Sequence, residues 1–233
     1  MPAPEPLVLV GSGGFGRETA EVVRAVNADH LDRHGAPRWA LAGFLDDDPA
    51  LWGRGVDGTP VLGSVDAVAD CPEARVVLCT GNPRNYTSKA AIARRLGLAP
   101  ERYATLVHPA AVVPPSAALG PGTVVLAGVV ATAAVRVGAH VGLMPQAVLT
   151  HDDDLADYVT VGSGARLAGG VTVGTGAYLG AGCLVREGLT IGPWALVGMG
   201  AAVVRDVPAA EVWAGLPARF LRTVELPHEV LLS

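Results

Sequence analysis

The chain has 233 residues, of which 50% are hydrophobic and 17% are charged, and it contains 30 glycines and 18 prolines. This composition is typical of a compact globular protein with many turns, and it excludes an intrinsically disordered chain. The formal net charge of −5, with no block of Lys or Arg, argues against nucleic acid or an anionic membrane as the main partner.

The first residues lack the features of a targeting or membrane segment. The stretch "MPAPEPLVLVGSGGFGRE" has no basic region, and its apolar run is only four residues long. We therefore expect a cytoplasmic protein without a membrane span. Cys71, Cys79 and Cys183 are odd in number and lack the spacing of metal ligands, so we expect buried free thiols and no bound metal.

Residues 5 to 100 alternate between predicted strands and helices. "PLVLVGSG" is a β-branched strand that ends in glycines, and the helix expected in "GRETAEVVRAVNA" places Ala20, Val23 and Val26 at helical spacing. We expect further strands in "WALAGFLDDD" and "ARVVLCTGNPRN", a strand and short helix in "TPVLGSVDAVAD", and a helix in "TSKAAIARRLGL". The pattern predicts an α/β Rossmann-like domain over residues 1–106. Its binding edge would lie at the carboxyl ends of the strands, in residues 11–16, 46–48 and 80–84.

The glycine loop after the first strand is a candidate anion site. "GSGGFG" is close to the GxGxxG spacing of dinucleotide-binding loops, and it opens the first predicted helix. Free N–H groups and the helix dipole favour a phosphate or a carboxylate at such a place. We therefore choose Gly13, Gly14 and Phe15 as substrate-binding residues.

After Val107 the sequence repeats with a period of six. Seventeen positions from Val107 to Val203, taken every sixth residue, hold sixteen large aliphatic residues and one alanine. The fourth residue after each of them is small or β-branched almost throughout, and no α-helix has this period. Such a hexapeptide repeat predicts a parallel β-helix over residues 107–220, in which three hexads close one triangular coil. Residues 221–233 are expected to be a C-terminal tail.

One corner of the repeat carries charge, in the stretch "AVLTHDDDLADYVTVG". His151 falls two residues after the inward-facing Leu149, at a corner position that faces outward. Imidazole suits a general base because it is largely neutral at cellular pH, but an outward corner histidine is in most proteins an ordinary surface residue. Spacing alone leaves both interpretations open. We expect solvated acids at Asp153 and Asp154 and surface positions for His30, His34 and His140.

The order of the motifs resembles one family over nearly the whole chain, the sialic acid O-acetyltransferases and bacillosamine N-acetyltransferases (NeuD/PglD-like). The resemblance rests on "GSGGFGRE", "FLDD", "TGNPRN", "LVHPAAVV", "THD", "GARLAGGVTVG" and "AGLPAR". It implies a left-handed β-helix and a homotrimer with acetyl-CoA in the groove between adjacent β-helices. It also implies an amino-terminal domain that holds a nucleotide-linked sugar, and acetyl transfer to that sugar, usually to an amino group.

The resemblance further implies roles for single residues. His151 matches the catalytic base, and Asp152 matches its acidic neighbour, which can hold the imidazole tautomer. Asp46 and Asp47 match acids that can bind the base or ribose hydroxyls of the nucleotide sugar. We expect Asn82 and Arg84 to contact its base or phosphate. The matching positions for acetyl-CoA are Thr160, Gly180, Ala181, Gly198, Met199 and Arg219, the last as a cation for phosphate. The alternative at these positions is structural, since coils need corner glycines and strand ends carry solvated acids.

Two positions depart from the family pattern. Met144 stands where members carry an asparagine seven residues before the histidine, and Thr160 stands where they carry a second histidine. The first departure puts the usual acceptor contacts in doubt. The second removes a possible contact to the CoA end of the thioester.

These features predict an acetyl-CoA-dependent acetyltransferase that acts on the amino group of a nucleotide-linked sugar, with His151 as general base. O-acetylation of a sugar hydroxyl uses the same site and stays open, as does a non-catalytic trimeric nucleotide-sugar-binding protein. A zinc enzyme is disfavoured because His140 and His151 are not at matching corners. An NAD-dependent oxidoreductase would lack a catalytic domain other than the β-helix.

Overall fold

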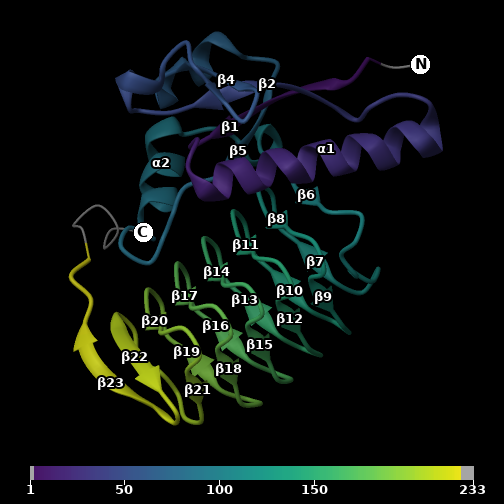
Figure 1. Ribbon diagram of the computed structural model, residues 1–233. Helices are drawn as coiled ribbons and strands as arrows, with labels where there is room; N and C mark the ends of the chain where they lie inside the picture. Colours follow the sequence, from purple (N-terminus) through teal and green to yellow (C-terminus); the bar gives the residue numbers. More distant parts are fainter. Residues whose placement is uncertain (1–2, 227–233) are drawn as a thin grey trace.

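The computed structural model describes residues 3–226 as a parallel sheet with helices, placed against one side of a long prism of short strands (Figure 1). The N-terminal sheet has the order β3-β4-β2-β1-β5, in which only β3 and β4 pair antiparallel. Its strands are β1 (Glu5–Val10), β2 (Trp39–Leu45), β3 (Gly55–Val56), β4 (Thr59–Gly63) and β5 (Arg75–Leu78). The helices are α1 (Gly14–His34) and α2 (Ser88–Leu96), with 3-10 turns at Pro49–Leu51, Val65–Asp70 and Pro100–Arg102.

The turn from β1 into α1 depends on glycine. Gly11 has a φ of 99°, and a Cβ on Gly16 would lie 1.9 Å from the carbonyl oxygen of Gly11. Glycine at both positions therefore lets the helix begin directly against the end of the strand. The helix extends past the stretch expected from the sequence, because no glycine or proline interrupts it before Gly35, which ends it with a φ of 74°.

The strands from β6 to β23 form three sheets that run along the prism (Figure 1). The junction sheet consists of β6 (Leu106–Val107), β8 (Val124–Val125), β11 (Gly142–Leu143), β14 (Thr160–Val161), β17 (Tyr178–Leu179), β20 (Leu196–Val197), β22 (Glu211–Gly215) and β23 (Ala218–Thr223). The polar sheet consists of β7 (Ala118–Leu119), β10 (Arg136–Val137), β13 (Asp154–Leu155), β16 (Thr172–Val173) and β19 (Thr190–Ile191). The apolar sheet consists of β9 (Val130–Ala131), β12 (Val148–Leu149), β15 (Arg166–Leu167), β18 (Leu184–Val185) and β21 (Ala202–Val203).

The register confirms the repeat as a β-helix. As far as β22, successive strands of each sheet pair in parallel, one coil apart, as Leu149 does with Leu167 and Val161 with Leu179. The last strand, β23, pairs antiparallel with β22. The repeated aliphatic residues form a single continuous core, and most of them are fully buried. Because burial of one such side chain contributes about 1.5–3 kcal/mol, this column of residues is the main source of stability in the prism.

The β-helix and the N-terminal sheet share a hydrophobic core. Leu7, Leu9 and Phe44 of the sheet belong to the same buried cluster as Leu106 and Val124 of the first coils. Further along the prism, the hydroxyl of Tyr86, in the loop before α2, donates to the carbonyl oxygen of Trp194 at 2.9 Å. The junction sheet is thus the face that meets the N-terminal sheet and its helices.

The boundaries expected from the sequence cross two strands. The β-helix begins with β6, which contains both Leu106 and Val107, and β23 continues through Thr223 into the expected tail. Residues 227–233 of that tail lie outside the described residues. Between residues 3 and 226, neither α1 nor α2 combines the length and apolar character that a membrane crossing requires.

Candidate active site

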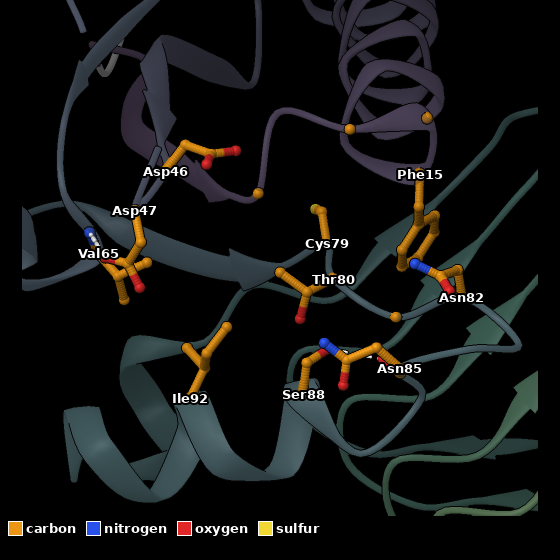
Figure 2. A pocket seen from close by; sticks show the side chains of 14 residues that line it. Phe15, Asp46, Asp47, Val65, Cys79, Thr80, Asn82, Asn85, Ser88 and Ile92 are labelled. Carbon is orange, nitrogen blue, oxygen red and sulfur yellow. Dashed lines mark hydrogen bonds between the residues drawn. The ribbon is translucent and has the colours of Figure 1, made fainter. Parts of the chain in front are cut away.

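A cavity of about 540 Å³ opens at the carboxyl ends of β1, β2 and β5 (Figure 2). It brings together the three stretches that the sequence placed at one binding edge, and α2 closes its lower side in this view. The lining residues are Gly11, Gly13, Gly14, Phe15, Asp46, Asp47, Val65, Cys79, Thr80, Gly81, Asn82, Asn85, Ser88 and Ile92. Asn85, Ser88 and Ile92 were not expected, although the polar stretch that runs from "TGNPRN" into the next helix is a signal for the first two.

The start of α1 lies at one end of the cavity. Gly13 is the N-cap residue, and no side chain caps the helix there. The space where a Cβ on Gly13 or Gly14 would stand is open, with no atom within 4 Å. The first N–H groups of α1 thus stay free of a side-chain cap beside the cavity, where the helix dipole favours negative charge.

Asp46 is held as a carboxylate by the glycine loop. Its Oδ2 accepts hydrogen bonds from the backbone N–H and the hydroxyl of Ser12, at 2.9 and 2.6 Å, and its Oδ1 accepts from the N–H of Asp48 at 3.1 Å. Burial is the largest single influence and raises the pKa of Asp46, but these hydrogen bonds together outweigh it and hold the pKa below its ordinary value. Asp46 therefore enters the cavity as an ionised acceptor.

Asp47 is committed to neighbouring protein groups. Its carboxylate accepts from Arg95 at 2.6 Å and from the N–H of Val65 at 3.1 Å, the latter drawn in Figure 2. The same guanidinium binds Asp66 and lowers the pKa of that carboxyl. Asp47 thus lines the cavity with most of its charge already compensated, which makes it a weaker candidate for a ligand hydroxyl than Asp46.

The loop after β5 places its two expected residues differently. Asn82 lines the cavity, and its Oδ1 accepts the backbone N–H of Arg84 at 2.9 Å. Arg84 is exposed and does not belong to the cavity lining. Thr80 also faces this space, and its Oγ1 is buried without a hydrogen-bond partner among the described residues.

His151 projects from a corner of the β-helix, where the chain passes from β12 of the apolar sheet to β13 of the polar sheet. Its Nδ1 lies 2.9 Å from Oδ2 of Asp152, and both side chains are more than two-thirds exposed, at 68% and 69%. Asp152 takes a φ of 63°, the left-handed conformation that Ala134 also takes at the equivalent corner of the preceding coil. A Cβ on Gly169, in the next coil, would lie 2.4 Å from Nε2, so the ring lies over this glycine.

Asp153 corrects an expectation from the sequence. It was expected to be a solvated acid, but its side chain is 0% exposed and points into the β-helix. The reason is its place in the repeat, since it stands four residues after Leu149, where the period requires an inward side chain. Asp154 lies on the outer face as expected for an acid there, and it pairs with Arg136 at 2.9 Å.

His140 also differs from the expectation, because it is buried rather than on the surface. It is 5% exposed, stacks on Tyr158 and meets the edge of Tyr103. Burial, with a smaller contribution from Lys89, lowers the pKa of His140 to about 4. This histidine is therefore a neutral packing residue between the β-helix and the N-terminal sheet. His30 is half-buried and His34 exposed, while Cys79 and Cys183 are buried and Cys71 is half-buried, all three as free thiols.

The residues expected at acetyl-CoA lie at a different edge from His151. Gly180, Ala181, Gly198 and Met199 form corners between the junction sheet and the apolar sheet, and Met199 is 79% exposed. Arg219 on β23 pairs with Ala214, whose Cβ faces Gly198. Thr160 is 5% exposed on the junction sheet, and Met144 packs against the hydrophobic cluster shared by the two parts of the molecule. Within one chain, the His151 corner and these corners therefore lie on opposite edges of the apolar sheet.

No metal cluster accompanies these residues: within residues 3–226, no three His, Cys, Asp or Glu side chains gather as a metal ion would need. No protein-family model matches the sequence, and no curated protein is similar enough to count as a match.

Solved structures match nearly the whole chain. The acetyltransferase domain of PglB from Neisseria gonorrhoeae, in complex with acetyl coenzyme A, is 30% identical with a TM-score of 0.77, over 94% of this chain and 100% of that one. PerB from Caulobacter crescentus, in complex with CoA and GDP-perosamine, is 33% identical with a TM-score of 0.73, over 93% and 97%. WeeI from Acinetobacter baumannii is 25% identical with a TM-score of 0.74, over 93% and 100%. At this identity and coverage, the chain belongs to the NeuD/PglD-like family of hexapeptide-repeat sugar acyltransferases.

Proposed function

We propose that this protein transfers the acetyl group of acetyl-CoA to the amino group of a nucleotide-linked sugar, with His151 as general base. The observation that carries the proposal is the exposed His151–Asp152 pair, in which Nδ1 is bonded to the carboxylate and Nε2 has no hydrogen-bond partner within residues 3–226. The similarity to structures that hold CoA together with GDP-perosamine supports the substrate class.

The pair accounts for the proton transfer. If Nδ1 carries the proton that it donates to Asp152, Nε2 is the unprotonated nitrogen and can accept a proton from the attacking amine. The amine nitrogen forms a bond to the thioester carbonyl carbon, and the carbon–sulfur bond then breaks. The proton on Nε2 passes to the leaving sulfur, which gives the amide and CoA. Asp152 stabilises the imidazolium between the two transfers.

The cavity at the strand ends fits the nucleotide of the acceptor. We take the N-terminal part as a Rossmann-like domain, in which the N–H groups near Gly13 and Gly14 bind a phosphate of the sugar nucleotide. The ionised Asp46 offers an acceptor for ribose or base N–H and O–H groups. Phe15 lines the cavity, and a Cβ on Gly142 of the β-helix would lie 3.2 Å from its ring, so the sugar would extend from the cavity toward the prism.

We further propose a homotrimer in which the donor site is shared. His151 and the corners expected at acetyl-CoA lie on opposite edges of the apolar sheet, so a neighbouring β-helix would have to bring one chain's donor corner to another chain's histidine. The outer face of that sheet carries Val130, Val148 and Leu184, the last 47% exposed, around a single cation, Arg166. An apolar face of this kind supports burial between copies.

Sugar O-acetylation is the second candidate, because a hydroxyl acceptor would use the same base. The test is the release of CoA from acetyl-CoA with nucleotide-linked 3-amino and 4-amino sugars and their hydroxyl counterparts. We expect one amino sugar to be acetylated, and His151→Ala to lower its turnover by about 100-fold to 10,000-fold, while Asp154→Asn, a change on the outer face nearby, leaves it unchanged. Turnover of the hydroxyl sugars alone would favour the O-acetyltransferase. Binding without any turnover would favour a non-catalytic nucleotide-sugar-binding protein.

A further inference from the structure

A buried carboxylate stands directly behind the His151 corner. Five successive inward positions at this edge of the prism, one per coil, are Val135, Asp153, Val171, Leu189 and Val207, and all five are buried. Only Asp153 among them is polar, and its side chain is 0% exposed. An acid in the axis of a β-helix loses its hydration, so its retention calls for a specific set of contacts.

A carboxylate oxygen of Asp153 accepts a hydrogen bond that a backbone carbonyl accepts in the neighbouring coils. In the coils before and after, the N–H of Thr132 donates to the carbonyl of Leu149 and the N–H of Ala168 to that of Val185, each at 3.0 Å. The equivalent N–H of Thr150 instead donates to Oδ2 of Asp153 at 2.8 Å. The hydroxyl of Thr150 donates to the carbonyl of Leu167 at 3.1 Å and so replaces the missing ladder bond.

The second oxygen of Asp153 reaches the next coil. Oδ1 accepts the N–H of Val171 at 2.9 Å. One carboxylate therefore joins the residue before His151 to the segment that contains Gly169, the glycine under the imidazole ring. The Asp153 carboxylate thus holds both the backbone next to His151 and the segment on which the imidazole ring lies.

We propose that Asp153 is a positioning residue for the reaction, which holds the corner so that Nε2 of His151 keeps its place relative to the thioester. This inference rests on the proposed role of His151 as base. Asp153 itself lies inside the prism and touches neither substrate. A displacement of the base by about 1 Å is enough to cost about 100-fold in rate, so a carboxylate that fixes this corner has a measurable effect.

The burial of an acid at this position lets an effect on stability be measured separately from an effect on the reaction rate. Burial raises the pKa of Asp153 to about 6, opposed by the N–H groups of Val171 and Thr150 and by His151, while the charge of Asp152 adds to the increase. No cation is bonded to the carboxylate among the described residues. An apolar residue of similar size removes the desolvation cost of this buried acid, which offsets the loss of its two hydrogen bonds. Valine is the residue that this position carries in the coils on either side.

The experiment compares Asp153→Val and Asp153→Asn with Asp154→Asn, in the full chain and with the acceptor that the wild type acetylates. For Asp153→Val we expect kcat to fall by about 10-fold to 100-fold, KM for acetyl-CoA to change by less than about twofold, and the melting temperature to stay the same or rise. Asp153→Asn keeps one acceptor oxygen, so its kcat should lie between those of Asp153→Val and the wild type. Asp154→Asn should keep the wild-type kcat.

A double-mutant cycle with His151→Ala separates positioning from general damage. If Asp153 acts through the histidine, Asp153→Val has no further effect on the rate once His151 is absent. Equal losses in both backgrounds, or wild-type kcat in Asp153→Val and Asp153→Asn, would overturn the proposal while the base assignment stands. Wild-type turnover in His151→Ala would remove the base assignment, and this proposal with it.

Discussion

Two histidines of the same β-helix, at two different corners, have opposite surroundings. His140 lies between β10 and β11, at the edge that meets the N-terminal sheet, and is 5% exposed among aromatic rings, with no hydrogen-bond partner for Nδ1 among the described residues. His151 lies between β12 and β13, at an edge that faces solvent, and its Nδ1 is bonded to Asp152. Both rings lie over a glycine of a neighbouring coil, Gly122 and Gly169 respectively. The chemistry of a corner histidine is therefore decided by what the edge faces.

The largest effect is expected from the exposed histidine. His151→Ala should lower kcat by about 100-fold to 10,000-fold because, among the described residues, it removes the only imidazole at this corner. His140→Phe should keep kcat within about twofold, since its ring packs between Tyr103 and Tyr158 and makes no contact with the His151 corner. Steady-state CoA release measures both. Comparable losses in the two variants would mean that this division of roles is wrong.

A smaller loss is expected from Gly169→Ala. The new Cβ would lie 2.4 Å from Cε1 and Nε2 of His151, so the imidazole must rotate away and kcat should fall by about 10-fold to 100-fold. In the His151→Ala background the methyl group has room, and the alanine should have no further effect on either rate or melting temperature. If Gly169→Ala lowers the melting temperature equally in both backgrounds, the glycine is needed for the fold of the coil and not for the placement of the imidazole.

The repeat made the β-helix predictable, but it did not reveal which edges are covered. The period of six fixed the inward residues, and the strand ends of the N-terminal part predicted the cavity edge. The same period places Asp153 inward, but an acidic residue suggested a solvated side chain. The prediction followed the residue type and was wrong. The burial of His140 depends on Tyr103, far away in sequence, and the cavity contacts of Ser88 and Ile92 depend on how α2 packs. Contacts of this kind follow from tertiary packing and leave no local pattern.

The buried histidine should be visible in the pH dependence of stability. The pKa of His140 is lowered from 6.5 to about 4, so between these values the unfolded chain binds a proton that the folded protein does not. Stability falls as the pH drops through this window, by up to about 3 kcal/mol for this group alone. Asp153 makes the opposite contribution to stability over an overlapping pH range. Because its pKa is raised to about 6, the folded protein binds its proton more tightly than the unfolded chain does.

The contribution of His140 is therefore measured as a difference. Urea unfolding of the wild type and of His140→Phe at pH 7.5, 6, 5 and 4.5 cancels the other groups. The variant should gain stability relative to the wild type as the pH falls. A constant difference at all four values would show that His140 is protonated with an ordinary affinity in the folded protein.

The smallest effect is expected at the outer face of the corner, where Asp154 differs from its neighbour Asp153 only by the direction of its side chain. Its ion pair with Arg136 is exposed, at 65% and 43% for the two side chains. Exposed pairs contribute about 0.2–1 kcal/mol, so Asp154→Asn should lower the free energy of unfolding by no more than that, and less in high salt. The same chemical change at Asp153 should alter the rate instead. A loss of several kcal/mol in Asp154→Asn would show that the outer face supports the corner, and that the inward carboxylate is not its main anchor.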